Sequence, residues 1–85
     1  MTNLTPAYVL FDFQCEEIER LYDLCVEKYG NDPRALSLHL TDCAWYLSRQ
    51  PSFADPYGEG VDYSESVFIA INEYIDDLKS PCVRA

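Results

Sequence analysis

The sequence is short of positive charge. It contains fifteen aspartate and glutamate residues but only six lysine and arginine residues, which gives a formal net charge of −9 on 85 residues. Because repulsion at this charge density costs folding stability, we interpret the excess as functional. Direct binding to nucleic acid or to an anionic membrane is disfavoured. A basic protein surface that normally holds phosphates is a well-matched partner.

The chain also lacks the segments that direct a protein into or across a membrane. The first basic residue is Arg20, and the longest early apolar run, residues 7–11, is too short for the apolar part of a secretory signal. No run is long enough to span a bilayer. Four cysteines without an export signal are expected to be free thiols in a reducing compartment, so the sequence predicts a cytoplasmic protein.

Signatures of catalysis and of metal binding are scarce. Among only three glycines, the segment 58–60 lacks the spacing and the lysine of a phosphate-binding loop. His39 and Cys43 are four residues apart on an apolar helix face, which favours a partly buried histidine and a core cysteine over a base and its nucleophile. We therefore expect no enzyme, no cofactor and no metal. One alternative stays open, a metal-binding adaptor that uses Cys15, Cys25, His39 and Cys43.

Hydrophobic residues make up 48% of the chain, which is enough for one small core but not for two. We expect a single domain over residues 1–85. Apolar residues recur at helical spacing over 12–29, with Asp12 as the N-cap and Gly30 as the stop signal. Residues 8–11 are expected to form an irregular or extended lead-in that packs on the core, although Thr5-Pro6 offers an earlier helix start.

A second helix is predicted over 33–49, because Asp32 is a good N-cap and proline is tolerated at the first helical position. Its main apolar face is expected to be buried. Leu38 and Trp45 lie on the opposite side of the helical wheel. We expect the N-terminal segment or the next loop to cover them; if they are uncovered, they form an interface.

The segment PSFADPYGEGVDYS, residues 51–64, reads as a long loop ordered by its own aromatic side chains. The pair Asp62 and Glu65 is a capping-box pattern, and it predicts a last helix over 63–79. The sequence thus predicts a small all-α domain of three or four helices with a long acidic loop, rich in tyrosine, proline and glycine, before the last helix.

The candidate site is electrostatic. Acids recur about once per turn along the first helix, at a spacing similar to that of successive phosphates on a nucleic-acid strand. Acids near the end of the last helix oppose its macrodipole, so stability alone would not select them, and Ile69 supplies an apolar anchor among them. The predicted partner-binding residues are Asp12, Glu16, Glu19, Asp23, Glu27, Asp55, Tyr57, Glu59, Asp62, Tyr63, Glu65, Ile69, Glu73 and Asp76.

In its layout from about residue 12 to residue 78, the sequence resembles the small immunity proteins that neutralise nuclease bacteriocins. The adjacent tyrosine pair of the DNase-type members is absent, because Tyr57 and Tyr63 are separated, and no residue role is carried over.

Our first functional hypothesis is a non-enzymatic, phage-type inhibitor, similar in kind to anti-CRISPR proteins, that mimics nucleic acid and binds a host nuclease or another DNA-binding protein. An immunity protein or antitoxin for a toxic nuclease is the alternative with the same chemistry. A homo-oligomer is left open.

Overall fold

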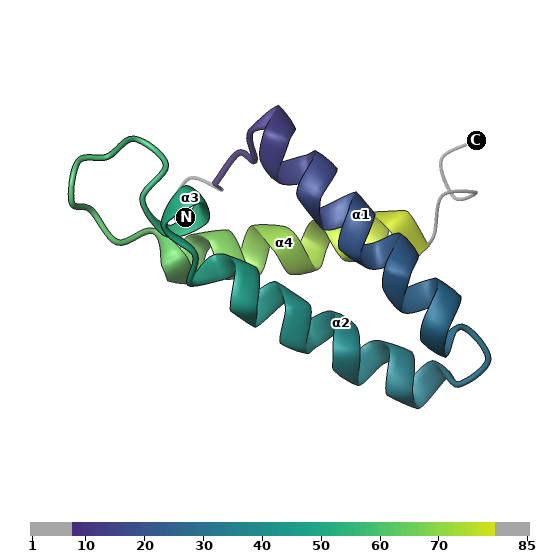
Figure 1. The fold of residues 1–85 in the computed structure, drawn as a ribbon. Coiled ribbons are helices and arrows are strands. Elements are labelled where there is room, and N and C mark those ends of the chain that lie inside the picture. The colour runs from purple at the N-terminus through teal and green to yellow at the C-terminus, as the bar shows by residue number, and fades with distance from the viewer. Residues whose placement is uncertain (1–7, 80–85) are drawn as a thin grey trace, which may run out of the picture.

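The computed structural model describes residues 8–79, and this range is entirely helical apart from its connections. Figure 1 shows the four helices, with no strand among the described residues. The predicted all-α class is confirmed, and the three main helices match the predicted ranges to within one residue. Their bounds, with those of one additional short helix, are α1 (Asp12–Tyr29), α2 (Pro33–Ser48), α3 (Pro51–Ala54) and α4 (Ser64–Lys79).

Helix α2 is central, because it packs against both α1 and α4, whereas α1 and α4 meet over a shorter crossing. In Figure 1 this crossing lies in the C-terminal half of α4, and the loop between α3 and α4 projects from the opposite end of the molecule. Among residues 8–79, no helix combines the length and the apolar character needed to cross a membrane.

The start of α2 is formed as predicted, but the start of α1 is not. The Asp32 carboxylate accepts a hydrogen bond from the Ala35 N–H at 3.2 Å, and Pro33 follows it as the first helical residue. In α1 the predicted N-cap, Asp12, is already helical. Phe11 is the capping residue, and its N–H donates to Gln14 Oε1 at 2.8 Å. The start of α1 is therefore capped through the side chain of Gln14, at the third helical position, and not through the predicted aspartate.

The predicted capping box of α4 is also formed differently. Asp62 Oδ1 accepts from the Ser64 N–H at 3.0 Å, two residues on, which is an Asx turn rather than a cap on Glu65. The Val67 N–H bonds to the Tyr63 carbonyl at 2.9 Å, so the helical hydrogen bonds begin one residue later than predicted.

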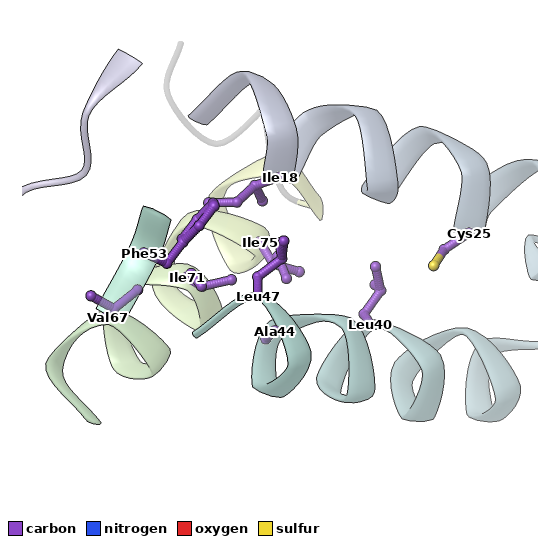
Figure 2. Close-up of a cluster of buried hydrophobic side chains, with 9 residues drawn as sticks. All are labelled: Ile18, Cys25, Leu40, Ala44, Leu47, Phe53, Val67, Ile71 and Ile75. Carbon is purple, nitrogen blue, oxygen red and sulfur yellow. The ribbon is translucent and has the colours of Figure 1, made fainter. Parts of the chain in front are cut away.

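One cluster of buried side chains joins all four helices, as Figure 2 shows. Phe53 is only 2% exposed, although the sequence placed it in a loop. Pro51 does end α2 as predicted, but it also begins α3, where a proline without an N–H is no loss. The cluster contains Ile18, Cys25, Leu40, Ala44, Leu47, Phe53, Val67, Ile71 and Ile75.

The N-terminal lead-in packs on this core as expected. Tyr8 and Leu10 contact the cluster, while Val9 between them is exposed, which is the alternation of an extended segment. The alternative helix start at residues 5 and 6 lies outside the described residues.

A fully buried glutamine fixes the lead-in and α3 to α1. Besides accepting from Phe11, Gln14 donates through Nε2 to the Ser52 carbonyl and to the Tyr8 hydroxyl oxygen, both at 3.2 Å. The Gln14 amide thus holds three separate parts of the chain together.

We predict that Gln14→Ala lowers the free energy of unfolding by about 2–3 kcal/mol, because it leaves the Phe11 N–H and the Ser52 carbonyl without their partner in a buried site. Urea denaturation followed by circular dichroism measures this. The control is Gln50→Ala, which removes a glutamine side chain that has no hydrogen bond in the described region. A Gln14 variant as stable as the control would contradict the role of this amide.

Candidate protein-binding surface

The five predicted acids of α1 form one exposed stripe along the helix. They follow one another at intervals of three or four residues, which places them on one side of an α-helix. All five side chains are exposed. We call this set the acidic stripe: Asp12, Glu16, Glu19, Asp23 and Glu27.

The acidic stripe lies on the side of α1 that adjoins α4. The Tyr74 hydroxyl of α4 donates a hydrogen bond to the Glu19 carboxylate, and this contact marks the helix crossing. The hydrogen bond to Glu19 and burial both raise the pKa of Tyr74, so its hydroxyl stays protonated and remains a donor at neutral pH. At the crossing, Glu19 of the acidic stripe therefore lies against α4.

The outward face of α4 is also acidic. Glu65, Ile69, Glu73 and Asp76 are separated by four, four and three residues, so they share one face of the helix, and all are exposed. Ile69 is 57% exposed in the middle of the row. The predicted apolar anchor therefore lies among carboxylates.

Few ion pairs within the described residues neutralise the carboxylates of this part of α1. Among residues 8–79 the ion pair between Arg20 and Glu17 is the only one, and Glu17 is not a member of the stripe. Its four members other than Glu19 have no side-chain hydrogen bond or ion pair in this part of the chain. These carboxylates are held close together without a cation from the described residues.

The loop is ordered from within, and two of its predicted binding residues take part in that ordering. The Asp55 carboxylate accepts from the N–H groups of Glu59 and Gly60, both at 3.0 Å. Gly58 and Gly60 adopt the positive φ values of 68° and 78° that these tight turns need. The backbone N–H of Ser64 holds the pKa of Asp62 below its usual range. Asp55 and Asp62 therefore shape the loop, while the Glu59 side chain remains exposed.

The loop tyrosines connect the loop to the start of α1. Tyr57 packs edge-on against Phe11 with ring centres 5.5 Å apart, and it also contacts Tyr63 at 5.8 Å. Tyr63 is half-buried against Tyr8, whereas Tyr57 is 56% exposed. The predicted site residues of the loop and the first member of the acidic stripe thus lie at the same end of the molecule.

The sequence did not predict a groove on the surface, and it left open whether Leu38 and Trp45 are covered. A groove of about 310 Å³ lies on the other side of α1 from the acidic stripe, between exposed Phe13 and Tyr46. Phe53 also lines it; the sequence predicted that Phe53 orders the loop, not that it belongs to a helix in the core. Leu38 and Trp45 are exposed, so the expected cover is not present among the described residues. The position of both residues opposite the main apolar face of α2 was the available signal.

The residues of the alternative metal site are only partly brought together. Cys25 and Cys43 have their Sγ atoms 3.8 Å apart between α1 and α2, but His39 stacks on Tyr29 with ring centres 4.0 Å apart. In the described part of the chain, no three histidine, cysteine or acidic side chains are grouped as a metal site would require.

No family model matches the sequence, and neither a curated protein nor a solved structure shows a significant match to the chain.

We predict that Cys43 reacts slowly with alkylating reagents at neutral pH. Burial, together with the neighbouring Cys25 thiol, raises the pKa of Cys43 to about 11, so the reactive thiolate is scarce below that pH. Labelling by iodoacetamide, mapped by mass spectrometry, should keep accelerating above about pH 10, where glutathione, the reference thiol with an ordinary pKa, has levelled off. Labelling of Cys43 in the folded protein that levels off at the same pH as that of glutathione would contradict this environment.

Proposed function

We propose that the protein is an acidic inhibitor that binds the basic, nucleic-acid-binding surface of a partner protein and blocks that surface by occupying it. The observation that carries this proposal is the acidic stripe, because its exposed carboxylates have no cationic partner among residues 8–79. Carboxylates held together in this way repel one another, and a partner that supplies lysines and arginines relieves the repulsion.

Helix α4 supports the same function. Asp76 and Asp77 stand in its last turn, where the macrodipole makes negative charge unfavourable by about a few tenths of a kcal/mol. Their positions are therefore hard to explain by stability. Exposed Ile69 and Tyr57 add apolar surface beside the acids, which is the composition of interfaces where a few anchors carry the binding energy.

The proposed mechanism is competition for the same cations. Residues 12–27 of α1 span roughly 22 Å at ~1.5 Å per residue, so the acidic stripe offers negative groups along a length comparable to several nucleotides. The charges steer association and set its orientation, and Tyr57 and Ile69 bury area once the complex has formed. Binding should weaken as salt is added, because exposed charges are screened.

The same surface fits two biological settings. A phage-type inhibitor of a host defence nuclease has to displace nucleic acid from a general binding surface, whereas an immunity protein or antitoxin is dedicated to one toxic nuclease. We place either in the cytoplasm. The settings are distinguished by competition: duplex DNA or RNA displaces the first kind of inhibitor, and only ligands of the nuclease active site displace the second.

We predict that Asp23→Lys with Glu27→Lys leaves helicity and thermal stability nearly unchanged but slows association with the partner, because both side chains are exposed and belong to the acidic stripe. The partner is isolated from bacterial lysate at low salt by the immobilised wild-type protein, then purified. Association rates are measured by surface plasmon resonance at several salt concentrations. Glu73→Lys with Asp76→Lys is the corresponding change on α4.

A matched control separates location from net charge. Glu27→Lys and Glu17→Lys change the charge of the same helix equally, but Glu17 lies outside the acidic stripe. The first should slow association more than the second. If the two single variants behave alike, or if both double variants keep wild-type affinity, the charge-led interface is wrong. If the purified partner binds no nucleic acid, the proposed nucleic-acid mimicry is wrong.

A further inference from the structure

The outward face of α2 is apolar and uncovered. While Leu40, Ala44 and Leu47 face the core, Leu38, Trp45 and Tyr46 are 69%, 53% and 60% exposed. Exposed aromatic and aliphatic side chains grouped on one helix are characteristic of a contact surface. We call Leu38, Asp42, Trp45 and Arg49 the outer face of α2, while Tyr46 lies on the flank of α2 that lines the groove beside α1.

This outer face differs in charge from the rest of the surface. Helix α1 carries six acids and two bases, and α4 carries four acids and one base. Helix α2 together with its two caps carries two acids, Asp32 and Asp42, and two arginines, Arg34 and Arg49. Two copies of a chain with a net charge of −9 repel each other at α1 and α4, but not at α2.

The two charged residues of the outer face, Asp42 and Arg49, form no ion pair with each other within one copy, and Arg49 donates a hydrogen bond to Ser48 Oγ at 3.2 Å. Asp42 and Arg49 are seven residues apart, so they lie on one face but about 10 Å from each other along the helix axis. Arg49 instead covers the Trp45 ring, with its Cζ atom 4.8 Å from the ring centre. Within residues 8–79, neither charged group has an ion-pair partner.

We propose that a second copy of this chain occupies the outer face of α2, in a two-fold symmetric dimer with the two α2 helices antiparallel. A two-fold axis that passes between Trp45 and Tyr46 places Asp42 of each copy opposite Arg49 of the other. The same axis brings the Trp45 side chains of the two copies to the same side of the contact, next to each other. Two ion pairs then flank an aromatic centre, which is the anatomy of a specific contact.

The dimer leaves the acidic surface of α1 and α4 free. The outer face of α2 points away from the core that α2 shares with α1 and α4, because Leu40, Ala44 and Leu47 on the other side of the helix are the buried residues. The dimer does not depend on the proposed function, and either one can fail without the other.

The test is a charge exchange in the full chain. Dimerisation is measured by analytical ultracentrifugation over a range of protein concentrations for the wild type, D42R, R49D and D42R/R49D. Each single variant creates two like-charge contacts per dimer and should weaken dimerisation about tenfold or more, while the double variant, which restores both ion pairs in exchanged form, should recover it. Trp45→Ala should weaken dimerisation without any change of charge.

The control is Arg34→Asp, which makes the same charge change as R49D on the same helix but outside the paired positions; it should leave dimerisation nearly unchanged. Circular dichroism verifies that each variant is folded. A wild-type protein that stays monomeric at all concentrations overturns the proposal. So does a double variant that dimerises no better than D42R. A dimer insensitive to all of these changes assigns the contact to another surface.

Discussion

The burial of Phe53 is the contact on which the loop end of the molecule depends. Phe53 closes the core where α1, α2 and α4 diverge, and it belongs to a helix of only four residues that has no stability of its own. That short helix is held from two sides: Gln14 of α1 bonds to the Ser52 carbonyl, and the Tyr63 N–H bonds to the Ala54 carbonyl at 2.8 Å. The second bond closes the loop and positions the first turn of α4. The packing of one aromatic ring therefore determines where the acidic loop lies.

The high negative charge, in contrast to the packing of Phe53, destabilises this small fold. Every carboxylate of the acidic stripe adds repulsion that the nine-residue core has to offset, and only one ion pair among residues 8–79 reduces the total. The structure keeps the acids on the outward sides of α1 and α4. Glu19 is the exception, because it accepts a hydrogen bond from Tyr74 and so links the two acidic helices at their crossing.

Features encoded by neighbouring residues could be predicted from the sequence, and features that depend on distant contacts could not. Asp32 and Pro33 define the start of α2 within a few residues, and the spacing of Val67, Ile71 and Ile75 defines the inner face of α4. Gln14 reads as a polar residue until Ser52, 38 positions away, provides its partner. Phe53 likewise follows a proline in a segment typical of loops, and only the core shows why it is helical.

The candidate site likewise has features that the sequence predicts and features that depend on distant contacts. Helical periodicity alone places the five acids of α1 in one stripe, and the structure keeps all five exposed. Periodicity says nothing about which stripes meet. The contact between Glu19 and Tyr74, 55 residues apart, shows that the acidic stripe reaches α4, and periodicity could not predict it. The loop illustrates the limit of composition, because Asp55 and Asp62 look like binding groups in the sequence yet accept backbone hydrogen bonds in the fold.

The separation of charge between the helices has a consequence for association. If the acids were spread evenly over the protein, every part of its surface would interact with a partner through the same salt-screened charge. Two copies would then repel each other at every surface. Here α2 is nearly neutral and apolar on its outward side, while α1 and α4 are strongly acidic. The proposed contact at α2 combines two ion pairs with buried apolar area and should weaken less with salt than a contact at the acidic stripe, which depends on charge alone. Salt can therefore distinguish the two surfaces of one molecule, because it acts on one kind of contact more than on the other.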